Sequence, residues 1–234
     1  MITIESTTVT PFQQNARVIT NSALGLAAIV DPGGEAERIL KTIDLTNTKV
    51  ESILLTHSHI DHCAGVVSLI QLLESKGQGR PKIFAGNERE LRASIVDQAR
   101  YFGLEPGDYF NCPEPEVLLE PGQTIDVCGV SLDARFTPGH SPGHFSFVFP
   151  KGEYLIIEQG RKQTVSAEVV IAGDALFKGS IGRTDFPGCS SEALLSSIRT
   201  QLFTLSDSAL VLPGHGPVTT IGVEKRSNPF LQRS

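Results

Sequence analysis

The sequence predicts an α/β fold in which two sheets pack face to face and helices cover their outer sides. Strand and helix patterns alternate through the first third of the chain, and the second half is mostly strand. Because a helix can bury only one stripe of its surface, we expect the helices on the outside of each sheet. No repeat, low-complexity tract or Pro/Gly-rich linker divides the 234 residues, so we predict a single domain over residues 1–234.

The strands expected in the first half are short, rich in β-branched residues and separated by polar turns. They cover residues 2–9, 16–20, 26–30 and 50–55. The turn Asp31-Pro32-Gly33-Gly34 precedes the first expected helix. Helices are predicted at residues 35–43, 64–73 and 87–98. The first half therefore has the elements of a sheet with helices along one side.

The second half is predicted to form further strands and one helix. The strands are expected at residues 124–127, 131–136, 144–149, 154–157, 168–172 and 209–212, and the helix at residues 191–202. The polar stretch at residues 158–167 is expected to be a long, exposed hairpin loop. These elements would form the second sheet and its helical cover.

The composition narrows the class of partner. Hydrophobic residues make up 40% of the chain and charged residues 20%, which indicates a globular protein. The net charge of −6 disfavours nucleic acid and anionic membranes as partners. The first twenty residues lack a signal-peptide pattern, and no apolar run is long enough to span a bilayer, so we expect the cytoplasm. The four cysteines are expected to be isolated thiols.

The segment Thr56-His57-Ser58-His59-Ile60-Asp61-His62 carries the strongest chemical signal. It holds 3 of the 6 histidines and lies between a buried strand and a helix, where sites on α/β scaffolds are built. His57 and His59 can aim at one point from an extended loop. Asp61 and His62 can address a second point where the helix begins. Imidazole and carboxylate suit zinc, iron or manganese, so the segment predicts a metal site.

Three later strand ends offer further metal ligands. His140 follows the strand at 131–136, Asp174 follows the strand at 168–172, and His215 follows the strand at 209–212. Each has a glycine beside it, which lets backbones approach closely. Taken singly, each has an ordinary structural explanation as a turn, cap or surface residue. Four strand-end loops with the same chemistry instead predict one shared metal centre.

This order of residues resembles the metallo-β-lactamase superfamily, and the resemblance covers nearly the whole chain. It implies a four-layer αββα sandwich with two divalent metal ions at one edge of the sheets. Zinc is the metal we expect, and iron or manganese is possible. Carried over residue by residue, the resemblance implies a first metal on His57, His59 and His140, a second metal on Asp61, His62 and His215, and Asp174 bridging both.

Within that superfamily the chain is similar to the short-type glyoxalase II enzymes, which are hydroxyacylglutathione hydrolases. The matching segments are Thr137-Pro138-Gly139-His140-Ser141-Pro142-Gly143-His144, Gly173-Asp174-Ala175-Leu176-Phe177, Gly182-Arg183-Thr184-Asp185-Phe186-Pro187, Pro213-Gly214-His215-Gly216-Pro217 and Asn228-Pro229-Phe230-Leu231. Only residues 216–234 follow the last histidine, so the C-terminal helical domain that helps longer relatives hold glutathione is not expected. The thiol carrier is left open.

The resemblance implies hydrolysis of a thioester, S-lactoylglutathione or a related acyl-thiol, by a hydroxide that bridges the two metals. Asp61 would orient the hydroxide. Arg183 either binds a substrate carboxylate or pairs with Asp185 or another acid to hold its loop. Asp31 either supports a ligand histidine from behind or is a turn aspartate. His144 either supports the site or simply begins a strand, and we favour the strand start.

Two other functions remain open. A mononuclear iron persulfide dioxygenase would use His57, His140 and Asp174 and would consume oxygen with glutathione persulfide. The second is a non-catalytic protein that binds metal or a thiol carrier and turns over no thioester. The number and identity of the bound metals, together with thioester turnover, separate these alternatives.

Overall fold

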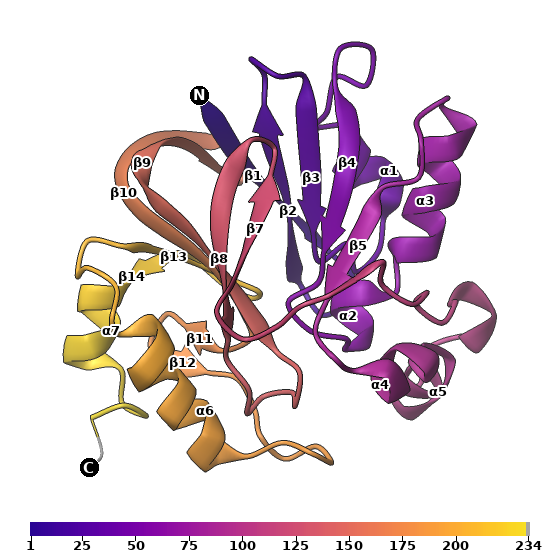
Figure 1. Cartoon of the computed structure of the whole chain (residues 1–234). Helices are drawn as coiled ribbons and strands as arrows, with labels where there is room; N and C mark the ends of the chain where they lie inside the picture. Colours follow the sequence, from indigo (N-terminus) through magenta and orange to yellow (C-terminus); the bar gives the residue numbers. More distant parts are fainter. Residues whose placement is uncertain (233–234) are drawn as a thin grey trace.

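The computed structural model of the chain describes residues 1–232. Its first half contains a sheet of mixed direction and the helices beside it (Figure 1). The strands are β1 (Ile2–Val9), β2 (Gln14–Asn21), β3 (Leu26–Val30), β4 (Lys49–Leu54), β5 (Lys82–Ala85) and β6 (Val117–Leu118). The helices are α1 (Ala36–Leu40), α2 (Ile60–Cys63), α3 (Val66–Ser75), α4 (Arg89–Ala93) and α5 (Ile95–Tyr101), followed by the 3₁₀ turn Pro106–Asp108.

The second half contains the other sheet and its helical cover. The strands are β7 (Gln123–Val127), β8 (Val130–Phe136), β9 (Phe145–Glu158), β10 (Arg161–Gly173), β13 (Leu210–Pro213) and β14 (Thr219–Thr220), and a small hairpin joins β11 (Leu176–Phe177) to β12 (Ser180–Ile181). The helices are α6 (Ser191–Ser197), which continues into the π-helical turn Ile198–Leu202, and α7 (Ile221–Ser227).

The long strand β9 joins the two sheets. Its first part pairs antiparallel with β8, and its last part, Tyr154–Ile157, pairs parallel with β1. The strand order along the main path is therefore continuous, β14-β13-β10-β9-β1-β2-β3-β4-β5-β6. A strand of this length can belong to both sheets because it curves as it passes between them, as the hairpin with β10 shows in Figure 1.

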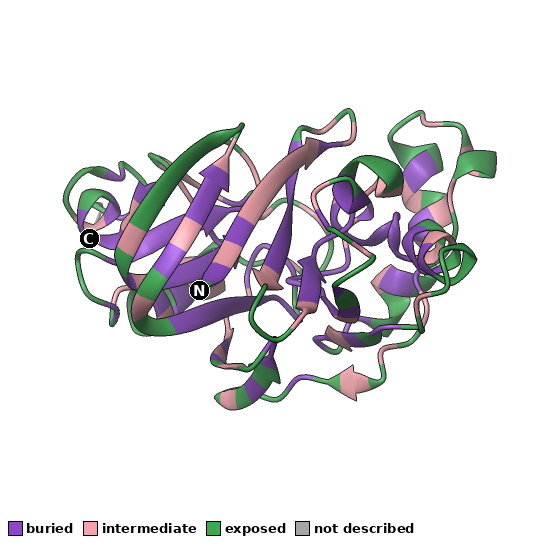
Figure 2. Ribbon diagram, turned by 90° about the horizontal axis from the view of Figure 1, so that it is seen from above, coloured by how far each residue is buried: buried purple, intermediate pink, exposed green. Residues whose placement is uncertain are grey.

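Three buried apolar clusters separate four layers. The middle cluster lies between the two sheets and includes Ile4, Leu132 and Phe147. A second lies between the first sheet and its helices, and a third, which includes Leu194, lies between the second sheet and α6 and α7. Figure 2 shows the helices with buried and exposed bands side by side, as expected for outer layers. The predicted αββα arrangement is thus confirmed.

The predicted loop at residues 158–167 was wrong. Residues 161–167 belong to β10 and pair with β9 across a two-residue turn, Gln159-Gly160, in which both residues have positive φ. The segment is polar because it is largely exposed, and its backbone pairing with β9 holds it extended. The strands expected at 144–149 and 154–157 are likewise one strand, β9, because this pairing continues past Pro150.

Other differences concern helix ends. The helix predicted at 87–98 is two short helices, α4 and α5, that meet at Ser94. The helix predicted at 35–43 ends at Leu40, and that at 191–202 changes to a π-helical turn after Ser197. Strand β5 and helix α7 were not predicted. Among the described residues, no helix is both long enough and apolar enough to cross a bilayer.

Candidate metal centre

The candidate ligands lie in loops at one edge of the two sheets. The loop after β4 carries His57 and His59, and α2 carries Asp61 and His62. The loops after β8, β10 and β13 carry the remaining ligands, His140, Asp174 and His215. Residues separated by more than 150 positions in the sequence are therefore brought within contact distance by strand order, as the pair of His62 and His215 shows.

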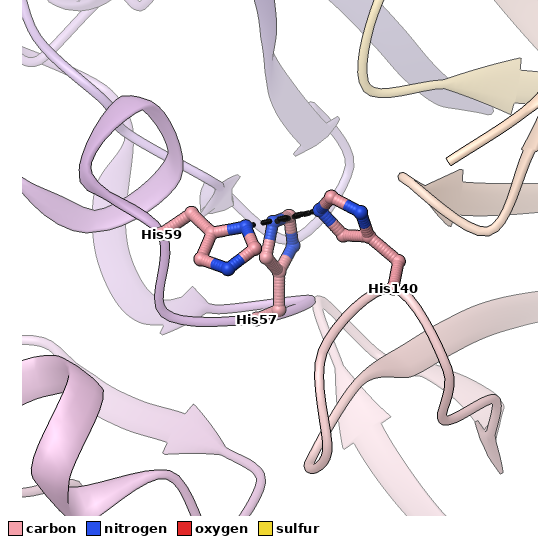
Figure 3. A group of neighbouring side chains, drawn as sticks. All are labelled: His57, His59 and His140. Carbon is pink, nitrogen blue, oxygen red and sulfur yellow. Dashed lines mark hydrogen bonds between the residues drawn. The ribbon is translucent and has the colours of Figure 1, made fainter. Parts of the chain in front are cut away.

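His57, His59 and His140 form the first group (Figure 3). The Nδ1 atom of His59 lies 3.0 Å from Nε2 of His140, and the same Nε2 atom lies 3.2 Å from Nε2 of His57. The rings meet edge to face with centroids 4.7–4.8 Å apart. Three ring nitrogens on separate residues thus point at one small volume.

Asp61, His62 and His215 form the second group. The Nε2 atom of His215 lies 3.1 Å from Oδ2 of Asp61 and 3.4 Å from Nε2 of His62. Asp174 lies between the two groups: its Oδ1 atom is 3.3 Å from Nε2 of His62, and its Oδ2 atom is 3.6 Å from Nε2 of His140. The structure therefore brings all seven predicted ligands together.

The hydrogen bonds behind the histidines determine which nitrogen faces the centre. Nδ1 of His140 lies 2.8 Å from the backbone carbonyl oxygen of Arg183, and Nδ1 of His215 lies 3.1 Å from that of Phe12. Because a carbonyl oxygen can only accept, each Nδ1 carries a proton. Nδ1 of His62 faces a carboxylate oxygen of Asp31 at 3.0 Å and is likewise the donor. In the neutral tautomers, Nε2 of each ring therefore presents a lone pair to the centre.

His57 follows the same rule through Thr56. The Thr56 hydroxyl donates to Oδ2 of Asp31 at 2.7 Å and therefore accepts from Nδ1 of His57, 3.0 Å away. Oδ1 of Asp174 is buried and has no hydrogen-bond partner. Lone pairs that converge without donors between them, together with an unpartnered buried carboxylate oxygen, fit a cation at this place. The His/Asp cluster fits a dinuclear metal site.

Charge at the centre agrees with this chemistry. Burial lowers the pKa of His57, and it lowers that of His59 to about 3, so both rings are neutral as metal ligands must be. At His62 burial is outweighed by the carboxylates of Asp174, Asp61 and Asp31, and its pKa is raised. Three carboxylates beside one ring, two of them buried, therefore favour positive charge at the second group.

Asp31 and His144 both lie behind the ligands. Asp31 accepts hydrogen bonds from the amide and hydroxyl of Thr56, each at 2.7 Å, as well as facing His62. His144 is fully buried, its Nδ1 lies 2.8 Å from the Thr137 hydroxyl, and its Nε2 accepts from the amide of Asp174 at 3.1 Å. We favoured a simple strand start for His144, whereas the structure brings it against a candidate ligand.

Glycine is required beside these ligands for space. A Cβ at Gly214 would lie 2.2 Å from Oδ1 of Asp174 and 2.8 Å from Cε1 of His62, inside the centre itself. A Cβ at Gly33 would lie 1.6 Å from the carbonyl oxygen of Asp61. The glycines of the strand-end loops therefore allow the backbone to approach the ligands, as their positions in the sequence predicted.

Arg183 is placed near the centre but is already paired. Its Nε and a terminal nitrogen each lie 2.7 Å from one carboxylate oxygen of Asp185, and the guanidinium lies 4.1 Å above the ring of Phe186. The salt bridge is exposed and holds the pKa of the Asp185 carboxyl at about 2. The structure therefore has the second of the two alternatives for Arg183, in which it pairs with an acidic residue, here Asp185.

A pocket of about 600 Å³ opens directly onto the metal centre. Its walls are mostly aromatic and apolar: Phe12, Leu91, Tyr101, Phe102, Phe186 and Pro187. Apart from Phe186, which stands in the segment Gly182-Arg183-Thr184-Asp185-Phe186-Pro187, no sequence signal indicated these aromatic residues, because they lie in different loops and share no sequence pattern. Asn15 was not predicted either, and its amide side chain donates to the carbonyls of Pro213 and Gly216 on either side of His215.

The four-layer sandwich and its edge of histidines and aspartates define a class of metal-binding proteins, most of whose members are hydrolytic enzymes. The family model that matches the chain is the metallo-beta-lactamase superfamily, over residues 9–157. The chain belongs to this superfamily. The resemblance seen in the sequence is thereby confirmed.

Relatives and solved structures give finer similarity. The chain is 41% identical over 230 residues, covering 97% of each chain, to the hydroxyacylglutathione hydrolase GloC of Haemophilus influenzae. It is similar in structure to BLEG-1 B3 metallo-beta-lactamase, with a TM-score of 0.79, 30% identity and coverage of 98% of this chain and 99% of that one. It is also similar to TTHA1623 in a di-iron-bound form, with a TM-score of 0.77, 33% identity and coverage of 97% and 99%.

Proposed function

We propose that the protein hydrolyses a thioester, S-lactoylglutathione or a related acyl-thiol, with two divalent metal ions. The similarity to a relative named hydroxyacylglutathione hydrolase supports the reaction. The single observation that carries the proposal is the convergence of five imidazole nitrogens and two carboxylates on one centre. Five of these seven residues line the pocket: His59, Asp61, His140, Asp174 and His215. Zinc is our first choice of metal, and iron or manganese suits the same donors.

The seven residues would divide as two sites that share one carboxylate. His57, His59 and His140 would hold one ion, and Asp61, His62 and His215 the other, with Asp174 shared between them. Two metal ions bound in this way would lower the pKa of a coordinated water from about 15.7 towards roughly 7 and would polarise the thioester carbonyl.

The chain's own side chains would prepare this reaction. Asp61 lines the pocket, so its carboxylate can orient a water molecule towards the carbonyl of a bound thioester. The hydrogen bond from His62 to Asp31 keeps the ring's proton on Nδ1, away from the centre. The leaving thiol has a pKa of about 8.5, so it can depart as thiolate without a protein acid.

We infer small-molecule partners and the cytoplasm for this enzyme, with no role for nucleic acid or membranes. The net charge of −6 supports this, as does the size of the pocket, which is typical of small-molecule sites. A substrate-binding role for Arg183 stays a prediction, since a substrate carboxylate would have to displace Asp185 from its guanidinium.

The test is metal analysis of the purified protein, combined with an S-lactoylglutathione hydrolysis assay and an oxygen electrode. We expect two metal ions per chain and thioester turnover. One iron ion per chain, with consumption of molecular oxygen when glutathione persulfide is added, would instead support the dioxygenase that uses His57, His140 and Asp174. Bound metal without turnover of any thioester would support a binding protein.

Asp61→Ala separates the two metal groups. The substitution removes a ligand of the second group and leaves His57, His59 and His140 untouched, so we expect one ion to stay bound and hydrolysis to fall by about 100-fold or more. Metal content and turnover are measured on the same sample. Asp126→Ala, an exposed change on β7, is the control. Unchanged hydrolysis in Asp61→Ala would remove the two-metal mechanism.

A further inference from the structure

Four aromatic residues from three separate segments meet at the mouth of the pocket. Phe12 comes from the turn between β1 and β2, Tyr101 and Phe102 from the end of α5, and Phe186 from the loop after β12. We call these four residues the aromatic rim. Phe102 lies at its centre, with ring centroids 5.2 Å from Phe12, 5.1 Å from Tyr101 and 6.3 Å from Phe186.

The aromatic rim is continuous with the metal centre. Phe186 packs edge to face against the candidate ligand His59 with centroids 5.5 Å apart. The carbonyl of Phe12 accepts the hydrogen bond of His215. A thioester with its carbonyl group at the metal centre, where Asp61 and Asp174 line the pocket, would therefore place either its acyl chain or its thiol carrier against these rings.

Two of the four rim residues, Tyr101 and Phe102, are exposed to solvent, and the other two, Phe12 and Phe186, are half-buried. Tyr101 is 74% exposed and Phe102 37%, although they contact each other and the pocket wall. Exposed apolar clusters of this kind usually mark binding surfaces, because leaving them in water is unfavourable. Their position around a pocket of about 600 Å³ at the centre points to a small apolar group as the occupant.

The charge of the pocket indicates which part of the substrate binds there. Among the described residues that line it, Arg183 is the sole lysine or arginine, and Asp185 already engages it with two bonds of 2.7 Å. The carboxylates of a carrier such as glutathione thus have no unpaired side-chain cation within the pocket. The acyl group is the part of such a thioester that can be apolar throughout.

We propose that the aromatic rim is an acyl-binding subsite that selects thioesters with a bulky apolar acyl group, aryl above all, over those with a small one. This proposal rests on the thioester hydrolysis proposed above. Phe102 is its central specificity-determining residue. A methyl group such as that of lactoyl leaves most of the rim uncovered, whereas a phenyl ring can stack against Phe102 and Phe186.

The experiment compares S-lactoylglutathione with S-mandeloylglutathione, in which a phenyl group replaces the methyl group on the same hydroxyacyl frame. We expect kcat/KM to be about tenfold or more higher for the mandeloyl thioester, since even one methylene group in an apolar pocket is worth roughly 10- to 200-fold and a phenyl group is larger than that. In Phe102→Ala we expect the ratio to fall below about threefold. Using the ratio within each variant cancels differences in folding and metal content.

Phe110→Ala is the matched control, because Phe110 is also an exposed phenylalanine, at 48%, but does not line the pocket. It should keep the wild-type ratio. A wild-type ratio near one, or in favour of lactoyl, would overturn the acyl subsite while thioester hydrolysis itself stood. A preference that survives in Phe102→Ala would also overturn it. Failure to hydrolyse either thioester, with metal bound, would count against the proposed function.

Discussion

Asp31→Asn tests whether a residue that touches no metal controls the second metal group. Asp31 is 2% exposed and accepts three hydrogen bonds, two from Thr56 and one from His62. Its φ of 50° lies in the left-handed region, which asparagine tolerates as well as aspartate. The substitution therefore changes charge and hydrogen bonding with little change in backbone or volume.

The size of the effect follows from the three bonds. Asparagine can keep the bond from the Thr56 amide, and its NH2 group can donate to the Thr56 hydroxyl instead of accepting from it. The NH2 group cannot accept from Nδ1 of His62, so that bond is lost. A hydrogen bond to a charged group contributes about 1.5–3 kcal/mol, so we expect the metal-free protein to lose about that much stability. If the His62 proton moves to Nε2, it faces Asp174 and blocks the lone pair, and metal affinity should fall about 10- to 100-fold.

The assay is a titration of metal against a competing chelator, with urea unfolding of the metal-free protein alongside. One of the two metal affinities, that of the second group, should fall and the other should change less, because His57, His59 and His140 are not bonded directly to Asp31. Asp126→Asn on the exposed face of β7 is the control. Two affinities within threefold of wild type in Asp31→Asn would refute the reasoning.

Two further substitutions test other parts of the site. Gly214→Ala places a methyl group 2.2 Å from Oδ1 of Asp174, so we expect loss of the second metal ion and a fall in turnover of about 100-fold. The circular dichroism spectrum should stay as in the wild type, and full metal occupancy would contradict the prediction. Burial raises the pKa of the Glu88 carboxyl above 4.5, opposed by the Gly143 amide, so the folded state keeps this proton to higher pH than the unfolded chain does. Stability should therefore decline as pH rises from 4.5 through the folded pKa, and Glu88→Gln should remove that decline in urea unfolding; an unchanged pH profile would show that Glu88 does not cause it.

Much of the fold could be predicted because the pattern of apolar residues is local. Strands at Ile2–Val9 and Leu26–Val30 were predicted with their observed bounds, and the two-sheet, four-layer arrangement followed from the order of elements. A hairpin between the strands now seen as β9 and β10 was predicted, but the extension of β10 back to Arg161 was missed, because a strand exposed on both faces has no apolar alternation. The backbone pairing that holds residues 161–167 extended is a contact between strands and leaves no local signature.

The sequence by itself determined the chemistry of the centre: histidine and aspartate at four strand ends, three of them with a glycine directly before the ligand, have few other uses. Only the tertiary structure decided which ring nitrogen faces inward, because that depends on distant acceptors such as the carbonyls of Phe12 and Arg183. It also decided that the pocket wall is aromatic and that Arg183 pairs with Asp185. These are contacts between separate loops, and strand order and packing bring such loops together where no local pattern can.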